Sequence, residues 1–148
     1  MVRDYISEVV LTPRRVSFPL NNERSFVLAD CGLRALSVGA GDFAKFSPGF
    51  KGRIVSIIAI VETETTDANA DATLSAEING TNTTGGSVTL NGTGGANPVT
   101  TVGRIEQGSL ITAANTFGPG DDINIEQAIT NAFSDGVVRV ILVLEETT

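Results

Sequence analysis

The chain has 148 residues, of which 41% are hydrophobic, and 17 acidic residues outweigh 10 lysines and arginines to give a formal net charge of −7. This length suits one domain, or one domain with an arm, and it is sufficient for a hydrophobic core. Because an acidic chain lacks the electrostatic footprint of a nucleic-acid-binding protein, we expect no nucleic-acid partner.

Targeting and membrane segments are not expected either. No stretch of the sequence reaches the ~18 apolar residues that a membrane-spanning helix needs, so we expect no membrane partner. Residues 1–8 are charged and lack the apolar segment of a signal peptide, so we expect no signal peptide. Cys31 is the single cysteine, so an intrachain disulfide is excluded, and we interpret this residue as small and partly buried.

Residues 1–24 predict an extended N-terminal arm. A short apolar run is interrupted at Pro13, which cannot donate to a sheet ladder, and a second alternating stretch ends at Pro19. Arginines are frequent in this segment, so the arm combines apolar and basic side chains. Two interpretations stay open: the arm grips a partner, or it forms a strand that covers the edge of the core.

From residue 25 onward the pattern predicts short β-strands separated by turns. Residues 25–29 predict a strand that ends at the Asp-Cys-Gly turn of residues 30–32, and residues 33–38 predict a further strand. After a turn at 39–42, residues 43–50 predict an aromatic-rich connection whose three phenylalanines close one end of the core.

The longest apolar run, residues 52–62, predicts the central strand because it is rich in β-branched residues. A helix is disfavoured there, since β-branched side chains lose rotamer freedom in helices. Strict alternation places Ile54, Ser56, Ile58 and Ile60 on one face and Val55, Ile57, Ala59 and Val61 on the other. A strand that is apolar on both faces is either covered on both sides or packs a core on one side and a partner subunit on the other. Residues 137–144 are the second such run, and we predict that the two pair or share one core.

The remaining elements are short and rich in turn residues. Asn79-Gly80 is a strong hairpin turn signal, and the Gly/Thr/Asn-rich segment around it has side chains too small to build a core. Residues 129–133 are ambiguous and compatible with a helical turn. The predicted strands are 72–78, 87–90, one or two within 99–111, and 123–126.

Short strands with Gly, Pro and Asn turns predict an all-β protein. The two richest core strands lie far apart in the sequence, which favours a jelly-roll-like (Greek-key) antiparallel β-sandwich over residues 25–148, with residues 1–24 as the arm.

Catalytic and metal-binding patterns are weak. The chain has no histidine, which excludes Ser-His-Asp and Cys-His catalysis and histidine metal sites. A glycosidase needs only two carboxylates, but Glu62, Glu64, Asp67 and Asp71 lie in or beside a polar loop, with no apolar cleft to raise a pKa. We therefore expect no enzyme activity and no cofactor.

A calcium loop was considered at Asp67-x-Asn69-x-Asp71. It lacks the EF-hand glycine and glutamate, because Ala72 and Ile78 stand at those positions. A surface calcium site of another kind stays open beside a plain solvated loop, with residues 121–122 as a second, equally weak candidate.

Several strand and turn phrases carry a family resemblance. They are residues 52–55, residues 74–81 followed by 85–90, residues 111–117 leading to 120–121, and residues 135–138. The run from Gly52 to Leu144 resembles the β-sandwich of small capsid decoration (cement) proteins of tailed bacteriophages. The same phrases also occur in phage fibre and spike domains.

The resemblance implies a jelly-roll-like homotrimer on the outside of an icosahedral phage head, at its three-fold or local three-fold positions. There it would bridge neighbouring major capsid proteins and stabilise the shell against the packaged DNA. In this interpretation the arm lies along the capsid or along neighbouring decoration subunits. The candidate partner-binding residues, chosen from the composition of the arm, are Val9, Val10, Leu11, Arg14, Arg15, Val16 and Phe18.

The alternative is a phage head-fibre or receptor-binding module whose Gly/Thr/Asn-rich loops, residues 79–98, make weak contacts with host glycans. A single tyrosine and the absence of tryptophan count against it, because stacking aromatic rings are the usual means of binding sugars.

Overall fold

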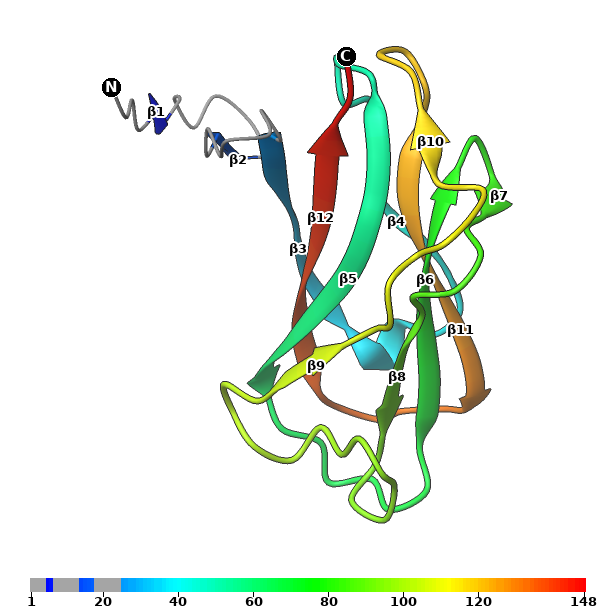
Figure 1. Ribbon diagram of the computed structural model, residues 1–148. Coiled ribbons are helices and arrows are strands. Elements are labelled where there is room, and N and C mark those ends of the chain that lie inside the picture. Colours follow the sequence, from blue (N-terminus) through cyan, green and yellow to red (C-terminus); the bar gives the residue numbers. More distant parts are fainter. Residues whose placement is uncertain (1–4, 7–13, 18–24) are drawn as a thin grey trace.

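The protein is described here by a computed structural model that covers residues 5–6, 14–17 and 25–148, with side chains from residue 25 onward (Figure 1). These residues form two antiparallel β-sheets that pack as a sandwich. The all-β sandwich predicted from the sequence is therefore confirmed.

The two sheets are named by their size. Each sheet has one edge at which two short strands share a longer neighbour. The large sheet runs in the order β1 (Tyr5–Ile6), β2 (Arg14–Ser17), β3 (Ser25–Ala35), β12 (Val137–Glu146), β5 (Gly52–Thr63) and β10 (Thr116–Phe117), with β9 (Ile105–Gln107) also beside β5. The small sheet runs in the order β4 (Gly41–Phe46), β11 (Ile123–Asn131), β6 (Asp71–Ile78) and β7 (Thr81–Asn82), with β8 (Val88–Asn91) also beside β6.

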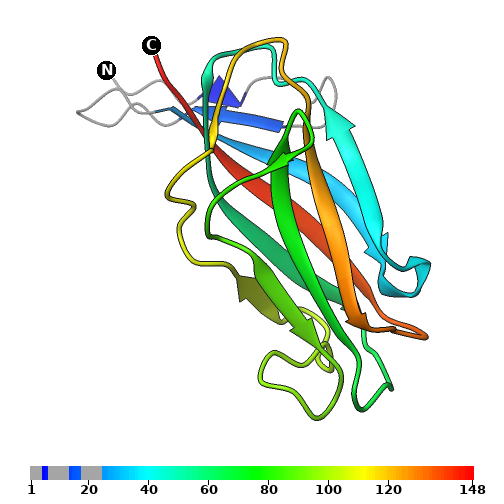
Figure 2. The same ribbon diagram turned by 90° about the vertical axis from the view of Figure 1, so that its right-hand side faces the viewer.

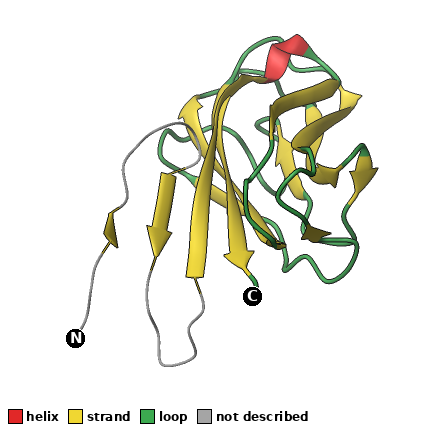
Figure 3. Ribbon diagram, turned by 90° about the horizontal axis from the view of Figure 1, so that it is seen from above, coloured by secondary structure: helices red, strands yellow, loops and turns green. Residues whose placement is uncertain are grey.

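The chain alternates between the sheets in the manner of a jelly roll. It crosses from one sheet to the other after β3, β4, β5, β8, β10 and β11. Figure 2 looks onto the small sheet with the large sheet behind it, and Figure 3 shows both sheets from above. Such crossings bring strands from the two ends of the sequence together in one core.

The predicted long-range pairing is confirmed at the centre of the large sheet. Strands β5 and β12 pair antiparallel from Val137 opposite Thr63 to Glu146 opposite Gly52. The only helical element among the described residues is a 3₁₀ turn at Leu36–Val38, where the sequence pattern predicted strand.

The alternation predicted for β5 breaks down after its first few residues, so the predicted division of its side chains between the two faces is wrong. Leu144 lies opposite Ile54 and Val143 lies opposite Ser56, so Val55 is an extra residue in a β-bulge. The bulge shifts the phase of the strand by one residue. The side chains that face the core are therefore Ile54, Ile57, Ala59 and Val61, and those that face outward include Val55, Ile58 and Ile60.

A second bulge corrects the predicted end of the first strand. Strand β3 continues through residues 30–32, because Arg139 pairs with Leu33 while Ile141 pairs with Asp30. Gly32 has a φ of +82°, and its N–H donates to Asp30 Oδ1 over 2.9 Å. The Asp-Cys-Gly signal was therefore a bulge within one strand rather than a turn between two.

Two further segments differ from prediction in the small sheet. The segment expected to be an aromatic connection includes strand β4, which pairs with β11 from Ile123 opposite Phe46 to Gln127 opposite Gly41. The ambiguous residues after 128 belong to β11 as far as Asn131, so they form strand and no helical turn. In both segments, hydrogen bonds to a neighbouring strand satisfy backbone groups for which the local sequence predicted no partner.

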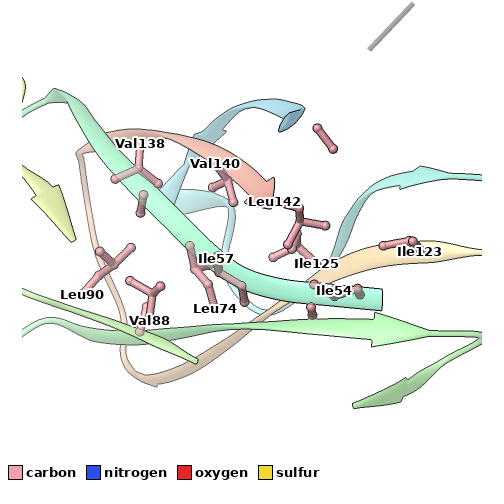
Figure 4. Packing of buried hydrophobic residues seen from close by; sticks show 14 of the residues in the cluster. Ile54, Ile57, Leu74, Val88, Leu90, Ile123, Ile125, Val138, Val140 and Leu142 are labelled. Atoms are coloured by element: carbon pink, nitrogen blue, oxygen red, sulfur yellow. The ribbon is translucent and has the colours of Figure 1, made fainter. Parts of the chain in front are cut away.

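Branched aliphatic side chains from both sheets fill the space between them (Figure 4). Ile57 and Leu142 from the large sheet, and Leu74 and Ile123 from the small sheet, are fully buried. The rings of Phe50 and Phe117 meet edge to face with centroids 5.5 Å apart. The three phenylalanines of residues 43–50 pack against this core, as predicted.

Candidate functional site

The outer face of the large sheet carries an unusual number of apolar side chains. On β5 and β12 the residues that point away from the core include Val55, Ile58, Ile60, Ile141 and Val143, beside charged residues such as Arg53 and Arg139. We call this surface the outer apolar face, and define it by Leu28, Val55, Ile58, Ile60, Ile141 and Val143. Leu28 is 41% exposed, and the other five residues are half-buried.

Two more exposed aliphatic residues flank the outer apolar face. Leu33 on β3 is 58% exposed and Ile105 on β9 is 61% exposed. They lie in the same row, because Arg139 pairs with both Leu33 and Ile60, and Ile60 pairs with Ile105. Ile105 adjoins Ile60 directly, whereas Arg139 separates Leu33 from Ile60. Exposed apolar surface marks interaction sites on soluble proteins.

The charges on this face are paired with one another. Arg139 donates to Asp30 Oδ2 over 2.9 Å and to Glu62 Oε1 over 3.0 Å. Arg53 donates to Glu145 Oε2 over 2.5 Å. The hydrogen bond to Glu62 raises the pKa of Arg139 further above its ordinary value, so it stays charged at any relevant pH. The half-exposed pairs of Arg139 add little stability, whereas Glu145 is buried beside Arg53, and together the pairs leave the face almost neutral.

The outer face of the small sheet is polar and acidic instead. Carboxylate oxygens of Asp42, Glu77 and Glu126 lie within 4.8 Å of one another. Glu77 is buried and accepts a hydrogen bond from Asn124 Nδ2 over 2.7 Å, and Asn82 Nδ2 donates to Glu126 over 3.0 Å. Oxygen ligands of this kind suit calcium. Nothing else at the cluster indicates a bound ion.

The aspartates considered as calcium ligands from the sequence hold loops together. Asp67 accepts hydrogen bonds from the N–H and hydroxyl of Ser134, which lower its pKa. Asp121 accepts from the Gly118 N–H over 2.7 Å, which lowers its pKa, and Lys45 lies 2.9 Å from Asp122. These carboxylates accept hydrogen bonds from, or form ion pairs with, other groups of the protein.

The carboxylates considered for glycoside hydrolysis do not meet in a cleft. Glu62 is bound by Arg139 on the outer apolar face, while Glu64 accepts from the Val102 N–H at the end of the sandwich. A pocket of about 150 Å³ lies elsewhere, between the edges of β3 and β4, and is lined in part by Asp30, Cys31 and Lys45. Burial raises the pKa of Cys31 to about 12, so its thiol is not a nucleophile at neutral pH.

The candidate partner-binding residues of the arm are only partly described. Val9, Val10, Leu11 and Phe18 lie outside the described residues. The backbone of β2 holds Arg14, Arg15 and Val16, and it pairs with β3 with Arg14 opposite Leu28 and Arg15 opposite Val27. The described part of the arm therefore adjoins the edge of the outer apolar face.

Sequence reasoning did not assign the outer apolar face as a site. The available signal was the central run, apolar on both faces, for which a partner subunit was one predicted explanation. The individual residues could not be assigned, because the bulge at Val55 decides which side chains of β5 point outward.

Among the described residues, no helix is long and apolar enough to cross a membrane. A scan against family models and searches of curated proteins and solved structures gave no match to this chain.

Proposed function

We propose that this protein is a non-enzymatic structural component of a phage virion. In this proposal it binds the outside of an icosahedral capsid as a homotrimer, bridges neighbouring major capsid proteins and stabilises the head. The capsid is inferred to be the binding partner from the resemblance of residues 52–144 to decoration proteins, because a jelly-roll fold alone does not define a function.

The observation that carries the proposal is the position of β1 and β2. They extend the large sheet beyond β3, and in the described part of the chain the small sheet has no strand opposite them (Figures 1 and 3). Among the described residues, β1 pairs with β2 alone, and β2 joins the sheet through only two paired positions on β3. Such strands gain stability when another surface covers them.

The composition of the arm supports contact with a partner. Residues 1–24 hold four arginines and three acidic residues, whereas the rest of the chain is strongly acidic. Arginine is enriched in protein interfaces because its planar group binds carboxylates in a fixed geometry. On a symmetric capsid, many modest contacts of this kind add to a high total affinity.

The glycan-binding alternative has weaker support. The segment 79–98 contains no aromatic residue, so its loops offer no ring on which a sugar can stack. The structural role is therefore favoured.

The test compares the full chain with a variant that lacks residues 1–20. Both are mixed with undecorated phage heads and sedimented. We expect the full chain to bind saturably and to raise the resistance of the heads to heat or chelation, and the truncated chain to stay folded but unbound. A full-length variant with Arg14→Glu and Arg15→Glu serves as a second probe of the arm. Truncated protein that still decorates heads, or full-length protein retained on host cells and not on heads, would contradict the proposal.

A further inference from the structure

We infer that the outer apolar face is the surface through which copies of this chain bind one another. This inference concerns a two-fold contact between copies, because the same face meets itself, and it is separate from the three-fold contact of the proposed homotrimer. It stands without the capsid role because its test uses the purified protein alone.

The first argument is the composition of the two faces of β5 and β12. Toward the core these strands present Ile57, Ala59, Val140 and Leu142, all buried. Away from the core they present Val55, Ile58, Ile60, Ile141 and Val143 among charged residues, with Ile58 directly opposite Ile141. Strands that are apolar on both faces are typical of sheets covered on both sides. A second sheet can pack on such a face at a distance of ~10 Å, as the small sheet does on the inner face.

The second argument is size. Strands β3, β5 and β12 have 11, 12 and 10 residues. At ~3.3 Å per residue and ~4.8 Å between strands, these three and the short strands beside β5 span roughly 500–650 Å² in plan. Protruding side chains increase the accessible area above this flat estimate, to the order of the ~800 Å² per partner found in stable complexes.

The third argument is charge. The outer face of the large sheet holds Arg53 and Arg139 together with Asp30, Glu62 and Glu145, and these form ion pairs within the face. A second copy brings the same mixed set, so arginines of one copy can meet carboxylates of the other. A partner with a strong charge of either sign would find no complementary field on this surface.

The fourth argument is where the remaining acidic groups lie. The cluster of Asp42, Glu77 and Glu126 is on the outer face of the small sheet, on the opposite side of the sandwich. Copies that meet through the outer apolar face keep these clusters apart. Self-association through this face therefore adds no repulsion between these clusters in a chain of net charge −7.

The test is light scattering of the purified full-length chain over a series of micromolar concentrations. We expect a mass that is a multiple of the 15.4 kDa monomer. Ile58→Lys places a charge at the centre of the face and should weaken self-association at least ~100-fold, as expected for a central interface residue. Val38→Lys is the matched control, because Val38 is 66% exposed and lies in the 3₁₀ turn between β3 and β4, outside the face, and it should keep the wild-type mass.

Circular dichroism and a thermal melt show whether each variant is folded. If Ile58→Lys does not fold, Ile141→Thr is the second probe, since threonine keeps the β-branched shape and removes apolar surface. A wild-type chain that is monomeric throughout the series overturns the inference. It is equally overturned if the folded face variant keeps the wild-type mass, or if Val38→Lys dissociates to the same extent.

Discussion

Asp135 accepts a hydrogen bond of 2.6 Å from the hydroxyl of Thr65, a residue 70 positions earlier in the chain. The same carboxylate accepts hydrogen bonds from the N–H and hydroxyl of Thr66. In return, Asp67 accepts from Ser134. The loop that follows β5 and the turn that precedes β12 are thereby held to each other at one end of the central strand pair.

We expect Asp135→Asn to lower the melting temperature at neutral pH, because one acceptor oxygen of this junction is lost. The Thr65 hydroxyl, followed by the Thr66 donors, holds the pKa of Asp135 below its ordinary range. A lowered pKa stabilises the fold above the ordinary aspartate value of about 3.9, and this contribution disappears as the pH falls through the lower folded-state value.

Thermal melts of wild type and Asp135→Asn at pH 7 and near pH 3 check this prediction. The difference between the two proteins should be largest at pH 7 and should shrink in acid. A difference that is the same at both pH values would show that the ionised carboxylate is not what stabilises the junction.

Gly52→Ala should destabilise the fold by about 1–3 kcal/mol, the usual cost of overpacking. A Cβ atom at Gly52 would overlap the carbonyl oxygen of Glu145 and lie 2.8 Å from Cζ of Phe117. Gly120→Ala is the control, since a Cβ there meets no atom within 4 Å. Urea unfolding of both variants provides the measurement, and equal free energies of unfolding would contradict the close packing at Gly52.

Ile57→Ala should cost about 2–5 kcal/mol of unfolding free energy, since it opens a cavity in the core. The prediction depends on the bulge at Val55, which turns Ile57 inward. Val38→Ala is the control because Val38 is 66% exposed and should change stability by less than about 0.5 kcal/mol. Similar losses in the two variants, measured by chemical denaturation, would rule out the inward position of Ile57.

The thiol of Cys31 should be nearly inert in the folded protein. Its pKa of about 12 is a consequence of burial. At pH 8 about one thiol in ten thousand is then ionised, against roughly one in four at the ordinary pKa of about 8.5. Iodoacetamide should therefore label the folded chain about a thousandfold more slowly than the chain unfolded in urea. Labelling at equal rates would show that Cys31 is accessible and ionised in the folded state.

Local composition was sufficient to identify the strands that build the core. Residues 52–62 and 137–144 are long, apolar and β-branched, and no other pair of segments can bury as much surface against each other. Their pairing and the all-β class therefore followed from the sequence. The turn at Asn79-Gly80 followed as well, because its dipeptide favours the positive φ angles of 52° and 74° that the structure shows. The role of the arm stays a prediction.

The tertiary structure determined which residues of each strand face the core and therefore which residues form the candidate site. The bulges at Val55 and at residues 31–32 depend on how β12 pairs with β5 on one side and β3 on the other. A one-residue shift moves every later side chain to the opposite face, and no local signal records it. The sequence by itself determined that the central strand is apolar on both sides. Only the pairing of distant strands decided that Ile58 and Ile60 lie outside and Ile57 inside, because alternation is a local property while register is set across the whole sheet.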